Sequence, residues 1–116
     1  MNELSGHTEI EWGGKKRPLK FNALTLRKFS ERYGLTLEQA MGLNFTQMEL
    51  HKAWDYIYFA MLVGYKSEGK EVDFTEDDVT MWAGEATVDD WEKIFRAMYW
   101  SNDIGLKRKA KDSKKK

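Results

Sequence analysis

The chain of 116 residues has no cysteine and only two histidines. Without cysteine there are no disulfide bonds and no thiolate metal ligands. His51 and Asp55 have the four-residue spacing of metal ligands on a helix, but two groups are too few for a site, and we read them as a polar strip. Neither histidine supports a Ser–His–Asp arrangement. We therefore expect no metal, no cofactor and no catalytic residue.

Long apolar runs are also missing. The longest, Tyr56 to Tyr65, is about half of the ~20 residues that a membrane helix needs. Met1 to His7 contains no apolar run, so we expect no secretory signal and an intracellular setting. Gly13-Gly14-Lys15 lacks the longer frame of a phosphate-binding loop and is typical of a hairpin turn.

Large aromatic residues and charges are abundant instead. The chain has five Trp, five Tyr and six Phe, and it balances 19 basic against 19 acidic residues. The charges are uneven, because the last ten residues hold seven bases and one acid, which leaves an acidic body. We expect residues 104–116 to form a disordered basic tail. Its cations are Lys107, Arg108, Lys109, Lys111, Lys114, Lys115 and Lys116.

Four threonines mark helix starts. Thr36-Leu-Glu-Gln39 and Thr46-Gln-Met-Glu49 match the capping box, in which hydroxyl and acid or amide satisfy each other's backbone N–H groups. Thr75-Glu-Asp-Asp78 and Thr87-Val-Asp-Asp90 are weaker variants with Asp in the third position. We read the acids in these first turns as complements of the helix dipole. The alternative is an acidic patch for a basic partner or a divalent ion.

The sequence predicts a mainly α fold in which a hairpin precedes five helices. Thr8, Ile10 and Trp12 alternate with polar residues, and so do Arg17, Leu19 and Phe21 of the second strand, so we expect these side chains to share one face. Pro18 favours an edge position. We expect a flexible N-terminus over 1–7 and a single compact domain over 8–103. Within it the hairpin spans 8–21, and the helices span about 22–33, 36–41, 46–63, 75–83 and 87–102.

Glycines predict where the helices end, and the spacing of apolar residues predicts which side of each helix faces the core. Gly34, Gly42 and Gly64 each follow a helical pattern and are expected to end a helix. The short helix 36–41 is expected to turn its apolar residues inward, together with Leu43. The last helix is expected to pack through one apolar face. In and beside helix 36–41 the inward-facing set is Leu37, Ala40, Met41 and Leu43. In the last helix it is Trp91, Ile94, Phe95 and Met98.

The number of large rings exceeds what five short helices usually need. A small domain cannot hide every large side chain, so some rings are expected at the surface, where Trp and Tyr favour contact with proteins. The candidate partner-binding residues are Trp54, Tyr58, Tyr65, Trp82, Tyr99 and Trp100.

The order of these features resembles that of a known family. A hairpin, Gly13-Gly-Lys-Lys-Arg-Pro-Leu-Lys-Phe21, is followed by a helix ending in Glu31-Arg-Tyr-Gly34 and by the turn Leu35-Thr-Leu-Glu-Gln39. A long aromatic helix ending in Leu62-Val-Gly-Tyr65 and the start Phe74-Thr-Glu-Asp-Asp-Val79 come next. Over residues 9–103 this pattern is similar to the tail assembly chaperones of long-tailed, siphovirus-type bacteriophages and prophages.

The resemblance implies a non-catalytic helper of virion assembly. Members of that family bind the long tape-measure protein and keep it soluble while tail-tube subunits assemble around it. The resemblance implies that the protein acts in the cytoplasm of the bacterial host and is absent from the mature virion. It also implies contact with the tape-measure protein and with the tail-tube protein, and self-association is a further option. Members of the family often also occur in a longer form made by ribosomal frameshifting. We hypothesise that an A-rich slippery run encodes the terminal lysines and allows such a frameshift.

A second reading assigns function to the basic tail. Lysines and arginines neutralise phosphates, so the alternative is an accessory protein that binds nucleic acid through residues 107–116. The tail lacks interleaved aromatics that would stack on bases, and the acidic body repels phosphates. We therefore favour a protein partner over nucleic acid.

Overall fold

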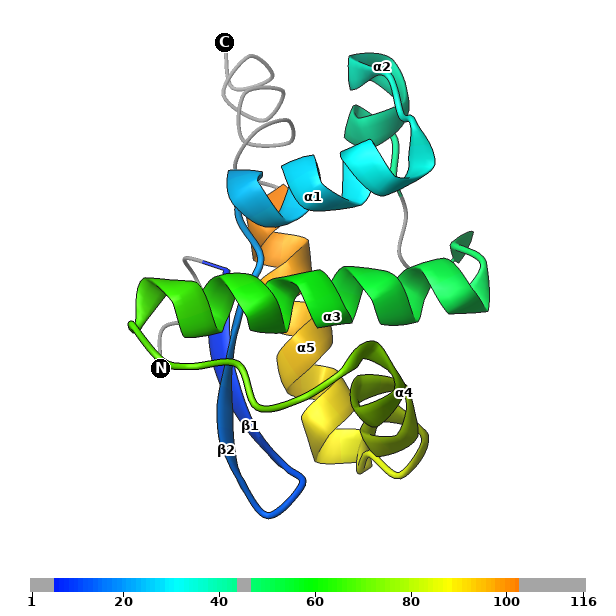
Figure 1. Cartoon of the computed structure of the whole chain (residues 1–116). Helices are drawn as coiled ribbons and strands as arrows, with labels where there is room; N and C mark the ends of the chain where they lie inside the picture. Colours follow the sequence, from blue (N-terminus) through cyan, green and yellow to red (C-terminus); the bar gives the residue numbers. More distant parts are fainter. Residues whose placement is uncertain (1–5, 44–46, 103–116) are drawn as a thin grey trace, which may run out of the picture.

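The computed structural model describes residues 6–43 and 47–102, and for residues 99–102 it describes the backbone alone. An antiparallel β-hairpin is followed by five helices in this part of the chain, as the sequence predicts (Figure 1). The elements are β1 (His7–Trp12), β2 (Lys15–Lys20), α1 (Ala23–Tyr33), α2 (Leu37–Met41), α3 (Leu50–Ser67), α4 (Glu76–Gly84) and α5 (Val88–Asn102). The predicted basic tail lies outside the described residues, and so do residues 1–5 of the predicted flexible N-terminus, 1–7. The prediction is wrong at its end, because His7 begins β1 and the Gly6 carbonyl accepts the Phe21 N–H.

The hairpin closes through a two-residue turn. Trp12 pairs with Lys15, which leaves Gly13 and Gly14 between the strands with φ angles of 62° and 83°. Glycine adopts such positive angles without steric cost, and this turn follows the natural twist of a hairpin. The predicted common face is confirmed, because all its members are buried: Thr8, Ile10, Trp12, Arg17, Leu19 and Phe21.

The predicted helix starts are confirmed at Thr36, Thr75 and Thr87. Each hydroxyl accepts the backbone N–H three residues on, and the side chain there accepts the threonine's own N–H at 2.9–3.1 Å. The start predicted at Thr46 is wrong, because α3 begins at Leu50. Thr46 itself lies outside the described residues, and Glu49, at the N-cap, makes no side-chain cap bond.

The prediction that Gly64 ends the long helix is also wrong. Helix α3 continues to Ser67, and Gly64 lies within it. A Cβ on Gly64 would lie 2.4 Å from the carbonyl oxygen of Pro18. The glycine therefore lets α3 cross β2 at close range and does not stop the helix. Gly34 does act as predicted, with a φ of 62° directly after α1.

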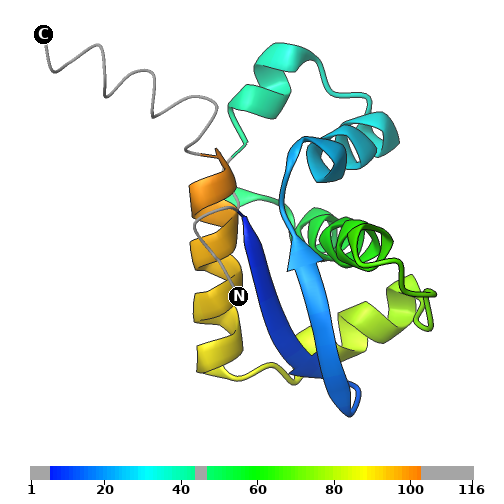
Figure 2. The same ribbon diagram turned by 90° about the vertical axis from the view of Figure 1, so that its left-hand side faces the viewer.

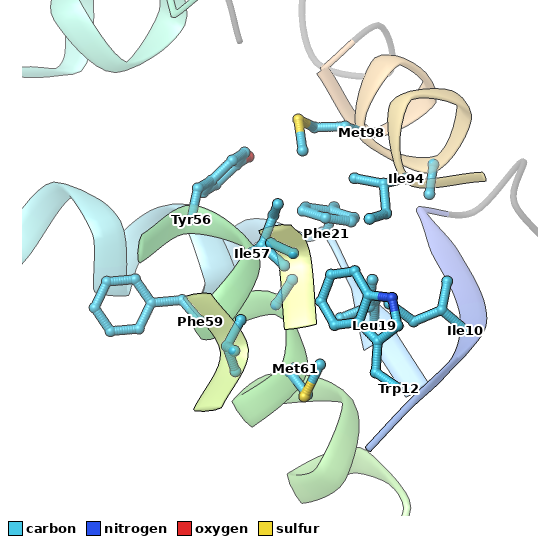
Figure 3. Close-up of a cluster of buried hydrophobic side chains, with 14 of the residues drawn as sticks. Ile10, Trp12, Leu19, Phe21, Tyr56, Ile57, Phe59, Met61, Ile94 and Met98 are labelled. Carbon is cyan, nitrogen blue, oxygen red and sulfur yellow. The ribbon is translucent and has the colours of Figure 1, made fainter. Parts of the chain in front are cut away.

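The hairpin lies between α3 and α5, which form the two outer walls (Figure 2). Ile10, Leu19 and Phe21 of the hairpin meet α3 and α5 residues such as Ile57 and Ile94 in one buried cluster (Figure 3). Helix α1 packs on α3 through Phe29, whose ring centroid lies 5.1 Å from that of Tyr56. Each such side chain contributes about 1.5–3 kcal/mol by its burial.

Helix α2 does not pack as predicted. Leu37 is 77% exposed and Met41 is 45% exposed, and no residue of α2 is buried. Leu35 and Leu43, on either side of the helix, are the ones that pack against the core. The helix is short, and these two flanking leucines hold the segment, while Leu37 and Met41 face outward and Ala40 is half-buried.

Candidate functional site

Tyr65 and Trp82, two of the predicted partner-binding residues, belong to an interior cluster around Arg17. Tyr65 is only 2% exposed, so its ring is not offered to a partner. The Trp82 ring is half-buried, lies 4.2 Å from the Arg17 guanidinium carbon and covers the turn, where a Cβ on Gly13 would come within 2.4 Å of the indole. We call Arg17, Tyr65, Asp73, Phe74 and Trp82 the Arg17 cluster.

Hydrogen bonds satisfy the buried charge of this cluster. Arg17 donates to the Trp12 carbonyl at 2.6 Å, to the Tyr65 hydroxyl at 2.9 Å and to the Asp73 carboxylate at 2.9 Å. Lys15 forms a second ion pair with Asp73. The hydrogen bonds from Lys15 and then from Arg17 lower the pKa of Asp73 to about 2. The cluster thus ties the hairpin to the end of α3 and to α4, which is a structural role.

Trp54 and Tyr58 are half-buried on α3. The Tyr58 ring meets Phe74 edge to face at 6.0 Å, so part of its surface is used in packing. The side chains of Tyr99 and Trp100 lie outside the described side chains, although their backbone belongs to α5. The cations of residues 107–116 also lie outside the described residues.

A polar network joins α1, α3 and α4, and it includes Asp55. Arg32 binds Glu76 through two hydrogen bonds of 2.9 and 3.0 Å and lies 3.4 Å from Asp55. The hydroxyl of Tyr33 donates to Asp55. Burial, followed by this hydrogen bond, raises the pKa of Tyr33 to about 12. Among the described residues no group of His, Asp and Glu could hold a metal ion.

The outer side of α5 exposes apolar residues, one of which, Phe95, was predicted to face inward. Val88 is 78% exposed and Phe95 is 42% exposed, and the Phe95 ring stacks on the half-buried Trp91 with centroids 5.8 Å apart. We call Val88, Trp91 and Phe95 the α5 stripe. The prediction that Phe95 faces inward is wrong, whereas Ile94 and Met98 are buried as predicted.

The spacing of the α5 stripe explains how it stays outside. Its members follow one another by three and four positions, so they align along one side of the helix. Ala97 lies on the far side of the helix, whereas Met98, three positions after Phe95, borders the stripe. Ile94, Ala97 and Met98 meet the core, and the half-buried Trp91 packs against its edge. In Figure 2 the hairpin lies on that inner side of α5, and no helix or strand of the described ranges lies on the outer side. Apolar residues occur around most of α5, so periodicity alone could not identify the covered side.

Carboxylates surround the start of the α5 stripe. Residues 75–92 contain seven acids and no lysine or arginine. Asp78 and Asp90 cap α4 and α5, which confirms the structural reading for these two, and Asp90 also accepts a hydrogen bond from the Trp12 indole at 3.2 Å. Glu85, Asp89 and Glu92 are exposed. The outer side of α5 is therefore both apolar and acidic.

The comparisons with known protein families, with curated proteins and with solved structures find no match to this chain. Within the described residues no helix has the length and apolar character that crossing a membrane requires. The α5 stripe is therefore the candidate functional site on its own physical grounds, as a helical surface suited to binding another helix.

Proposed function

We propose that this protein is a tail assembly chaperone of long-tailed bacteriophages or prophages. It binds the tape-measure protein and keeps it soluble during assembly of the tail tube, and it performs no catalysis. The proposal rests on the resemblance of residues 9–103 to that family and on one observation, the exposed α5 stripe. It acts in the cytoplasm of the bacterial host and leaves before the virion is complete.

The α5 stripe suits such a client. A tape-measure protein is long, helical and apolar, so segments that are not yet covered by tube subunits aggregate. A helix that presents apolar residues three and seven positions apart can pack along one turn after another of a client helix. Helix α2 exposes Leu37 and Met41 over only one turn, so it offers a shorter contact.

The size of the contact fits a transient complex. Tube subunits must displace the chaperone, so the contact has to be moderate in strength. Three apolar residues on one helix, of which Phe95 is 42% exposed and Trp91 is half-buried, form a small surface. A small surface of this kind is consistent with binding that protects the client and is then reversed.

Co-expression with a tape-measure protein encoded in the same gene cluster tests the proposal. We expect the wild-type chain to move the tape-measure protein from the pellet to the supernatant. The double variant Val88→Ser/Phe95→Ser should lose most of this effect, and the matched α2 variant Leu37→Ser/Met41→Ser should keep it. A tape-measure protein that stays insoluble with the wild-type chain would overturn the proposal. Circular dichroism of each variant checks that the fold is kept.

A further inference from the structure

The charge beside the α5 stripe restricts which helices it accepts. Glu92 follows Val88 by four positions and therefore lies one turn further along the same side of α5. Asp89 lies next to it around the helix, and Glu85 lies in the turn that leads from α4 into α5. All three side chains are exposed. The first two turns of the stripe are thus bordered by carboxylates.

These three carboxylates are exposed to solvent, although Lys93 follows Asp89 and Arg96 follows Glu92 by four positions on α5. Asp90 differs from its neighbours because its carboxylate is used by the Thr87 N–H and the Trp12 indole. Asp89 lies 3.8 Å from Lys93, but its side chain is 75% exposed, and such a pair contributes little. Lys93 and Arg96 are the first bases after residue 75. An incoming acidic segment would meet repulsion at Glu85, Asp89 and Glu92, whereas a basic one would meet attraction.

We infer that the α5 stripe binds an amphipathic helix whose apolar side is flanked by lysine and arginine. The apolar side packs on Val88, Trp91 and Phe95, and the cations reach the three exposed carboxylates. The apolar contact provides most of the strength, and the charges select the partner and speed its approach. This inference rests on the proposed function, since it states which segments of the tape-measure protein the chaperone covers.

The chain's own basic residues do not fit the surface as well. Residues 107–116 hold seven lysines and arginines, but alanine is their only apolar residue. They match the charge of the surface and offer nothing to cover the α5 stripe. An external helix with both properties is the better occupant.

Binding of two designed peptides to the full chain tests this inference. One is an amphipathic helix of about 18 leucines and lysines, and the other has the same leucines with glutamate in place of lysine. We expect the lysine peptide to bind at least about tenfold more tightly than the glutamate peptide, with an advantage that shrinks as salt is added. Titration calorimetry at low and high ionic strength measures both.

Charge reversal of the surface provides the decisive variant. Glu85→Lys/Asp89→Lys/Glu92→Lys should lose the lysine peptide and gain the glutamate peptide. The matched variant Glu31→Lys/Glu38→Lys/Glu71→Lys changes net charge equally at exposed positions outside α4 and α5, and it should bind like the wild type. Equal loss in both variants, or equal binding of both peptides by the wild type, would overturn the inference.

Two further outcomes would assign the surface to another occupant and overturn the inference as well. The first is a dimer that the α5 charge reversal dissociates, with no peptide bound. The second is peptide binding that appears only after residues 107–116 are removed. A protein that selects the lysine peptide but leaves the tape-measure protein insoluble would refute the proposed function alone. A soluble tape-measure protein with the α5 charge-reversed variant would refute this inference alone.

Discussion

The Arg17 cluster and the α5 stripe each contain a half-buried tryptophan, but the other rings of the cluster, Tyr65 and Phe74, are buried, whereas Val88 and Phe95 of the stripe are exposed. In the Arg17 cluster the rings of Phe74, Tyr65 and Trp82 surround a guanidinium that is 4% exposed. In the α5 stripe the exposed Phe95 ring stacks on Trp91, which itself packs against the edge of the core. The difference teaches that an aromatic residue is buried when an element from elsewhere in the chain reaches it. The number of rings alone does not decide it.

The largest expected effect comes from removing the charge at the centre of the Arg17 cluster. Arg17→Met should lower the free energy of unfolding by about 3 kcal/mol, because the buried Trp12 carbonyl and the Tyr65 hydroxyl lose their donor. Arg27→Met removes an exposed ion pair with Glu31 and should cost no more than about 0.5 kcal/mol. Urea unfolding measures both, and equal losses would mean that the cluster is not a structural centre.

The turn beneath Trp82 allows a finer test within the same cluster. Gly13→Ala and Gly14→Ala both place a side chain at positive φ, at a shared cost of about 1–2 kcal/mol. Only the Cβ at position 13 meets the Trp82 ring, so Gly13→Ala should cost about 1–3 kcal/mol more. If the two variants unfold at the same urea concentration, the indole does not pack on the turn as described.

Acid should weaken the Arg17 cluster and leave the α5 stripe unaffected. The pKa of Asp73 is lowered from 3.8 to about 2, so its ion pairs stabilise the fold fully above pH 3.8. This contribution is lost as the pH falls through about 2. Asp73→Asn should therefore show a flatter decline in stability between pH 5 and pH 2 than the wild type. Thermal unfolding across this range measures the slopes, and parallel declines would contradict the assigned pairing.

The smallest expected change in stability is in the α5 stripe, at Val88. Val88→Ser should alter the free energy of unfolding by no more than about 0.5 kcal/mol, because Val88 is 78% exposed. The same variant is expected to reduce client binding, so stability and binding separate at this position. A loss of several kcal/mol in urea unfolding would show that Val88 supports the fold and is not held ready for a partner.

Local signals predicted most of the fold, and distant contacts account for what they missed. The hairpin turn, the caps at Thr36, Thr75 and Thr87, and the order of the elements follow from residues close together in the chain. The role of Gly64 depends on Pro18, far away in sequence, so the prediction ended α3 too early. No local pattern could show that none of the residues of α2 is buried.

The candidate site was predicted less well than the fold. The sequence indicated spare aromatic rings but not their places, and it offered Tyr65, which the Arg17 cluster buries. It turned Phe95 inward, because Trp91, Ile94, Phe95 and Met98 read as one apolar face. Only the position of the hairpin shows which side of α5 is covered. The weak signal that was present is Val88 between the capping Thr87 and Asp89, at a helix start where the side chain is exposed.

Site-specific photo-crosslinking tests the central claim most directly. A photoreactive residue replaces Val88 in one variant and Leu37 in another, since the two side chains are 78% and 77% exposed. Each variant is co-expressed with the tape-measure protein and irradiated. We expect a covalent adduct with the tape-measure protein from position 88 and little or none from position 37. An adduct from position 37 alone, or from neither position while the tape-measure protein stays soluble, would contradict the claim that the α5 stripe holds the client.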